Sequence, residues 1–77
     1  MATWVRTQSG NTVTYTITDT ENNTLAVNVL TNQVTGNSIT MTSTGGLRQD
    51  GQQLLSQLML QLQTGLLPNS IIPGSNS

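Results

Sequence analysis

The sequence contains no cysteine, no histidine, no lysine and no phenylalanine. Without cysteine a disulfide is impossible, and without histidine or cysteine a structural metal is disfavoured, so we predict neither a metal site nor a cofactor. A chain of 77 residues normally depends on a disulfide, a metal or a partner for firm stability. Association with other protein subunits, in a homo- or hetero-oligomer, is the expectation that remains.

Charge is equally scarce, because only 6% of the residues are charged and the net charge is -1. Arg6 and Arg48 are the only cations, too few to neutralise phosphates, which argues against nucleic acid as a partner. No apolar run approaches the roughly 20 residues that span a bilayer, and the opening MATWVRTQSG lacks the pattern of a secretory signal. We expect a soluble protein with no membrane partner.

Aromatic residues are limited to Trp4 and Tyr15, and hydrophobic residues make up 34% of the chain. A domain of this size buries only roughly 60–65% of the surface that its unfolded chain exposes, so the core must be small. Low charge is nevertheless not the signature of disorder. The composition predicts one small folded domain.

Alternating apolar and polar residues predict strands at 12–18, 24–30 and 38–44, with a fourth at 2–8 if that segment pairs. In TVTYTIT, residues 12–18, every second residue is threonine, which places a hydroxyl row opposite an apolar row. The segments between the strands are rich in Gly, Asn, Asp and Ser, as turns are. Short turns between such strands predict an antiparallel meander of three or four strands.

The stretch QQLLSQLMLQLQ predicts a helix over about 51–64, with Asp50 and Gln53 as a capping box and Gly65 as the left-handed residue after the helix. One arc of this helix is apolar and should cover the sheet, whereas Leu60 lies opposite. The predicted fold is α+β, with a domain over 1–66 and an extended C-terminal arm over 67–77. The covering arc consists of Leu54, Leu55, Leu58, Met59, Leu62 and Leu66.

Catalysis needs titratable groups brought together, and this sequence offers few of them. Each of its carboxylates, Asp19, Glu21 and Asp50, falls in a predicted turn or cap. A weak cation site at Asp19 and Glu21 is conceivable, against the simpler interpretation of a solvated turn. We therefore predict no catalytic residue, no small-molecule substrate and no enzymatic activity.

The candidate partner-binding residues come from the first strand, from the helix face opposite the covering arc and from the tail after Gly65. Trp4 and Arg6 share one face of the first strand, where an aromatic and an arginine could form an interface spot, although they could equally be ordinary surface residues. The tail is expected to dock on a neighbouring subunit, and the alternative is that it folds back over its own sheet. The remaining candidates are Leu60, Leu66, Leu67, Ile71 and Ile72.

The threonine row at 12–18, extended by Thr40 and Thr42, suggests a second kind of site. Regular hydroxyl rows occur on glycan-binding and ice-binding surfaces, but threonine also favours strands and solubilises a face without charge. A small glycan- or host-binding module that uses this face with Trp4 is therefore the alternative function. A regulator of one host protein is a third class, and it predicts a monomer until the target is supplied.

A cysteine-free chain that is rich in Thr, Asn and Gln and combines a β-meander, one helix and an extended arm resembles the small structural proteins of tailed-phage virions. The resemblance is one of composition and carries over no particular residue. It implies a passive role as a head decoration or cement protein, or as a neck or tail component. We accordingly expect a structural subunit located in a virion. It should bind neighbouring subunits through strand edges, the second face of the helix and the C-terminal arm.

Overall fold

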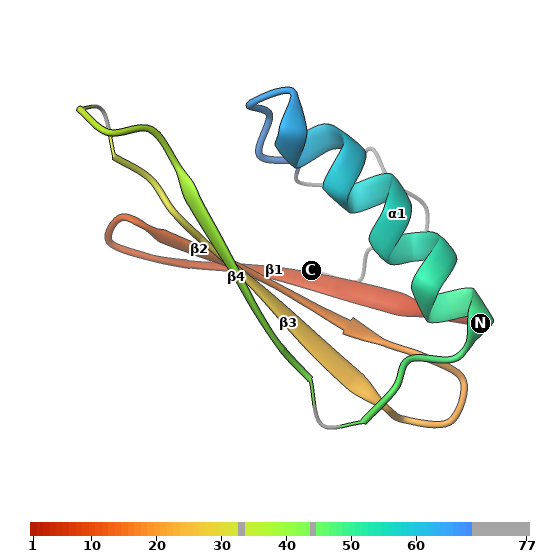
Figure 1. Cartoon of the computed structure of the whole chain (residues 1–77). Helices are drawn as coiled ribbons and strands as arrows, with labels where there is room; N and C mark the ends of the chain where they lie inside the picture. Colours follow the sequence, from red (N-terminus) through yellow and green to blue (C-terminus); the bar gives the residue numbers. More distant parts are fainter. Residues whose placement is uncertain (33, 44, 69–77) are drawn as a thin grey trace.

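The computed structural model describes residues 1–32, 34–43 and 45–68 and has an α+β fold, as predicted. Four antiparallel strands form one sheet in chain order, and a single helix lies on one of its faces (Figure 1). The segment at the N-terminus does pair, so the meander has four strands rather than three. The elements are β1 (Thr3–Ser9), β2 (Thr12–Thr18), β3 (Thr24–Leu30), β4 (Ser38–Ser43) and α1 (Gln49–Gln63).

Tight turns set the register of the strands. Gly10 and Asn11 connect β1 to β2, and a positive φ of 57° at Gly10 only is the arrangement of a type II′ hairpin turn. Asn22, with a φ of 64°, occupies the left-handed position of the turn between β2 and β3, which asparagine tolerates better than most residues. Each strand pair keeps one register along its whole length, without a bulge.

The alternation of the strands divides the sheet into two chemically different faces. Trp4, Ile17 and Leu25 are cross-strand neighbours on the face toward α1, and so are Tyr15 and Val27. The helix adds its own leucines to this face, and together they form one hydrophobic core. The buried core residues are Ala2, Trp4, Val13, Tyr15, Ile17, Val27, Val29, Leu47, Leu54, Leu58 and Leu62.

Helix α1 begins at Gln49, two residues before the predicted start, and the capping box predicted at Asp50 is wrong. Asp50 lies inside the first turn, where its charge still suits the positive end of the helix. Arg48 is the N-cap residue, and its side chain makes no capping hydrogen bond. The first turn is held instead by the Gln52 side chain, which donates to the carbonyl oxygen of Leu47 at 2.8 Å.

The helix ends as predicted, with Gly65 in the left-handed conformation at a φ of 84°. The N–H of Leu66 donates to the carbonyl of Gln61, and the N–H of Gly65 donates to that of Leu62, which together form a Schellman motif. The predicted covering arc is confirmed in its centre: Leu54, Leu58 and Leu62 are buried, and Leu55 and Met59 are partly buried against the core.

Candidate association surface

The helix covers the sheet unequally, and β4 is the strand that it leaves open. Tyr15 and Val27 are fully buried, but Met41, the next residue in the same cross-strand row and on the same face, is 54% exposed. Ile39, its neighbour along β4, is only partly buried. The buried core therefore extends as far as β3. The helix-side residues of β4 form a partly exposed apolar strip next to it.

The outer edge of β4 also lacks the features that protect edge strands. Natural sheets protect an edge with lysine, proline, a bulge or an inward-pointing charge. The sequence SITMTS of β4 contains no charge and no proline, and its pairing with β3 is regular. In the described part of the chain β4 pairs with β3 alone, so its second row of backbone N–H and C=O groups is available to another strand. We call this edge, with Ile39 and Met41, the β4 edge.

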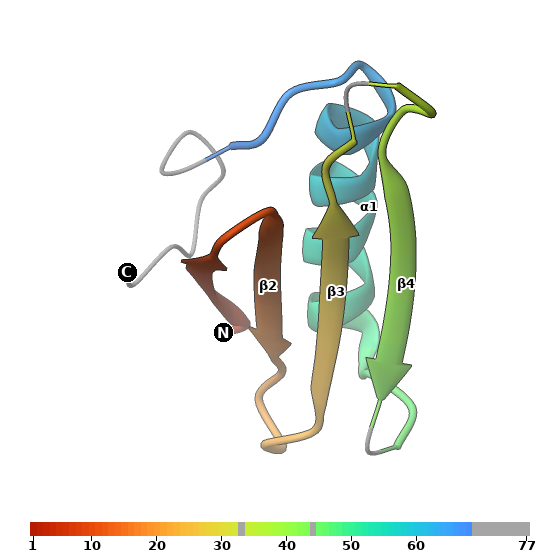
Figure 2. The same cartoon turned by 90° about the vertical axis from the view of Figure 1, so that its left-hand side faces the viewer.

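The opposite edge, formed by β1, is protected in two ways. Arg6 places a charge on the helix side of this strand, across from Tyr15. The segment after α1 passes toward the β1 side of the sheet (Figure 2), and the Tyr15 hydroxyl donates to the carbonyl oxygen of Pro68 at 2.7 Å. Burial raises the pKa of Tyr15, and the nearby Arg6 guanidinium opposes this rise, so the hydroxyl stays protonated and acts as the donor.

The beginning of the predicted C-terminal arm belongs to the domain itself. Leu67 packs against the core and is partly buried, and Pro68 is buried, so this part of the arm lies against its own domain; a partner contact at Leu67 stays a prediction. The Gly65 turn points the chain back across the sheet, which favours the fold-back alternative as far as Pro68. Leu66 is 52% exposed and remains a candidate. The other two candidates in the arm, Ile71 and Ile72, lie outside the described residues.

Replacing Tyr15 by phenylalanine tests this fold-back. The change removes the hydroxyl that holds Pro68 and leaves a buried carbonyl without its donor, so we expect a loss of about 1 kcal/mol of unfolding free energy. Urea unfolding followed by circular dichroism measures this loss. Thr16→Val, which removes a hydroxyl from the opposite face of the same strand, is the matched control and should change stability less. A Tyr15→Phe protein as stable as the parent would contradict the docking of residue 68.

Trp4 is a core residue, which corrects its prediction as a partner-binding residue. It is 1% exposed, and its ring lies against that of Tyr15, with the ring centroids 5.6 Å apart. Trp4 and Arg6 lie on one face of β1, as the alternation of the strand predicted. The sequence pattern did not show that this face is turned toward α1. Arg6 is partly buried beside it. Leu60 lies on the far side of the helix and is 62% exposed, so it remains available to a partner.

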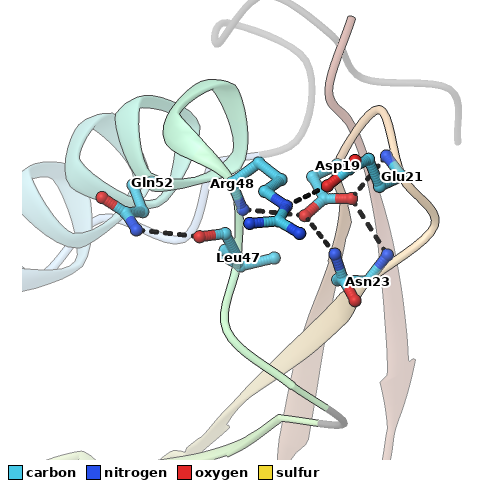
Figure 3. A network of polar contacts seen from close by, with 6 residues as sticks. All are labelled: Asp19, Glu21, Asn23, Leu47, Arg48 and Gln52. Atoms are coloured by element: carbon cyan, nitrogen blue, oxygen red, sulfur yellow. Dashed lines mark hydrogen bonds and ion pairs between the residues drawn. The ribbon is translucent and has the colours of Figure 1, made fainter.

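Asp19, expected to be an ordinary turn residue, is buried and joins the β2–β3 turn to the start of α1 (Figure 3). Its Oδ1 accepts from the backbone N–H groups of Glu21 at 2.8 Å and Asn23 at 2.9 Å. Its Oδ2 accepts from the side-chain amide of Asn23 at 3.0 Å and from the N–H of Arg48 at 2.8 Å. Both oxygens are thus occupied by N–H donors, an arrangement that suits a structural clamp and not a cation site.

These contacts also explain the charge of Asp19 and the glycine that faces it. Burial alone would raise the pKa of Asp19, but the hydrogen bonds from Arg48, Asn23 and Glu21 stabilise the carboxylate and lower the pKa to about 2. A Cβ on Gly51 would lie 3.1 Å from the Cβ of Asp19, so the glycine in the first turn of α1 permits the close approach. Arg48 also forms an exposed ion pair with Glu21.

The threonine row of β2 continues on β1 and β4, on the face of the sheet opposite α1, but β3 interrupts it with Ala26, Asn28 and Leu30. Thr14 donates to the side chain of Asn28 across β2 and β3 at 2.9 Å, and this face carries no charged residue. Trp4 lies on the other face, so a glycan-binding surface here would lack the aromatic residue it was expected to use. The hydroxyl residues of the face are Thr3, Thr7, Ser9, Thr12, Thr14, Thr16, Thr18, Thr24, Ser38, Thr40 and Thr42.

Comparisons with protein-family models, with curated proteins and with solved structures found no match to this chain. Among residues 1–32, 34–43 and 45–68, no three His, Cys, Asp or Glu side chains gather where they could hold a metal ion. Within the same residues, no helix has the length and apolar character needed to cross a membrane. The candidate site that rests on the geometry of the described residues is the β4 edge.

Proposed function

We propose that this protein is a non-enzymatic structural subunit of a larger protein assembly and that it binds a neighbouring subunit through the β4 edge. The observation that carries the proposal is the combination of an unprotected strand edge with an apolar strip, Ile39 and Met41, at the margin of the core. A strand added to such an edge gains main-chain hydrogen bonds, and its side chains can cover the apolar strip. The partner's side chains would thereby enlarge the small hydrophobic core of this chain.

The state of the polar side chains supports binding in preference to chemistry. Asp19 is occupied by four N–H donors, and Glu21 is paired with Arg48 on the surface. General acid–base catalysis would need such groups to face a substrate instead. The contacts of these carboxylates fit a role in holding the fold together.

The assembly that we propose is the virion of a tailed phage, as a head decoration or cement protein or as a neck or tail component. Support comes from the composition and from the uncharged contact surfaces. Leu60, on a helix face that otherwise carries glutamine, offers a second contact that would not bury an unpaired charge. The arm with Ile71 and Ile72 is a third contact in this proposal.

Introducing a charge into the β4 edge tests the function. Met41→Lys places an ammonium group where a partner strand would cover it, so we expect the tagged variant to be lost from the large particle that carries the parent chain. The measurement is sedimentation of a lysate of the producing cells on a density gradient. Gln57→Lys adds the same charge on an exposed helix position and should sediment like the parent.

Two results would overturn the proposal. One is a parent chain that sediments only as a free small protein under conditions where its gene is expressed. The other is incorporation of Met41→Lys at the parent level, which would remove the β4 edge as the contact. Circular dichroism of the purified variant establishes that the fold is retained.

A further inference from the structure

The partner strand at the β4 edge can be identified from the sequence of β4 itself. We infer that the β4 edge pairs with the β4 edge of a second copy of this chain, antiparallel and about a two-fold axis at Thr40. The inference rests on the proposed function, because it names the partner at the same edge.

The pattern of β4 is nearly symmetrical about Thr40. Apolar Ile39 and Met41 flank it on the helix side, and Ser38 and Thr42 follow on the hydroxyl side. Antiparallel pairing about Thr40 sets Ile39 opposite Met41 of the partner subunit and Ser38 opposite Thr42 of the partner subunit. Each cross-strand pair then joins two residues of the same chemical kind. Such pairs of facing side chains are what stabilises neighbouring strands of a sheet.

Other registers lose this match. A slip by one residue sets Ile39 opposite Thr42 of the partner subunit and brings the apolar side of one strand onto the hydroxyl side of the other. A slip by two residues, with the axis at Met41, leaves Ile39 opposite Ser43 of the partner subunit. Pairing about Thr40 is the register that covers both apolar residues of each copy.

Charge favours self-association at this edge and opposes it at the other. A two-fold axis through a strand sets the residue at the axis opposite its own copy, so a charge at that position meets a like charge. β4 has none, whereas pairing of two β1 strands about their centre would bring two copies of Arg6 together. The segment that ends at Pro68 also lies on the β1 side (Figure 2).

The pairing completes the core that α1 leaves open. Residues opposite one another in antiparallel strands share a face, so both helices lie on the same side of an eight-stranded sheet. Met41, 54% exposed in the single chain, then lies on the sheet between the two helices and opposite Ile39 of the partner subunit. A closed dimer of this kind has no further β4 edge, so it supplies the building block of the assembly.

Cysteine cross-linking tests the register, because the chain has no cysteine of its own. Opposed residues in antiparallel strands have Cα atoms about 4.5–5.5 Å apart, within the range that a disulfide spans. The purified Thr40→Cys chain should therefore form a disulfide-linked dimer under mild oxidation at least about tenfold faster than Thr42→Cys, whose copies are offset along the strands. A mixture of Ser38→Cys and Thr42→Cys chains should cross-link to each other.

Three outcomes would overturn the inference. Equal rates for Thr40→Cys and Thr42→Cys would indicate random collision, and an unchanged rate after adding Met41→Lys to Thr40→Cys would show that strand pairing is not involved. Absence of cross-linking in a Thr40→Cys chain that still enters its large particle would leave the proposed function standing with a different partner at the β4 edge. All three cysteine positions are exposed, so folding should be preserved, and circular dichroism checks this.

Discussion

Replacing Trp4 by alanine is expected to remove most of the stability of the fold at room temperature. Trp4 is the largest fully buried side chain, and Tyr15, against which it packs, is the only other aromatic residue. Truncation of a buried tryptophan costs about 3–5 kcal/mol, because apolar contacts are lost and a cavity remains. A small domain has a total stability of only about 5 kcal/mol, so a loss of this size removes most of it.

Far-UV circular dichroism and the dispersion of amide signals in a proton NMR spectrum measure the loss of fold. Trp4→Phe is the matched control, since it keeps an apolar ring, and it should fold with a lower midpoint of thermal unfolding. A Trp4→Ala protein with the melting temperature of the parent would place Trp4 outside the core. Its earlier interpretation as a partner-binding residue would then return.

Replacing Asp19 by asparagine is expected to lower the melting temperature by roughly 10 °C. The carboxylate accepts four N–H groups with two oxygens, whereas an asparagine side chain offers one oxygen and turns an NH₂ group toward donors. The turn between β2 and β3 and the first turn of α1 lose a shared acceptor, so two distant parts of the chain loosen together. Glu21→Gln removes only the exposed ion pair with Arg48 and should shift the midpoint by about 2 °C or less.

Asp19 should also make the free energy of unfolding depend on pH. The pKa of Asp19 is about 2 in the folded protein, below the ordinary value of 3.8. The unfolded chain therefore takes up a proton at higher pH than the folded one, and the stabilisation is complete above about pH 5 and is lost as pH falls from about 4 through 2. Urea unfolding at about pH 6 and about pH 2.5 should show a smaller decrease for Asp19→Asn than for the parent. An equal decrease in the two proteins would contradict the Asp19 clamp.

The candidate site could be predicted from the sequence only in general terms. Strand edges were expected to bind neighbours, but a sequence does not say which edges of a sheet remain open. Arg6 protects the β1 edge by its own charge, whereas the segment after Gly65 protects it only because the chain folds back toward Tyr15. The exposure of Met41 follows from the position of α1 over the sheet, which no local pattern contains.

Local rules account for what the sequence determined by itself. Three features depend only on residues close together in the chain. They are the period of two in the strands, the glycines with positive φ at Gly10 and Gly65, and the arc of leucines in α1. These features gave the α+β meander with its covering helix and the far-side position of Leu60.

The tertiary structure decided everything that depends on contact between distant residues. Trp4 is buried because it lies on the sheet face toward α1 and shares one core with the helix leucines. The helix starts at Gln49, where the N–H of Arg48 donates to Asp19, a residue 29 positions earlier in the chain. The segment that packs over a side chain decides its burial and its hydrogen-bond partners. The local amino-acid pattern does not show which distant segment this will be. For this reason the sequence described the elements of this protein, and only the packed chain distinguished the protected β1 edge from the open β4 edge.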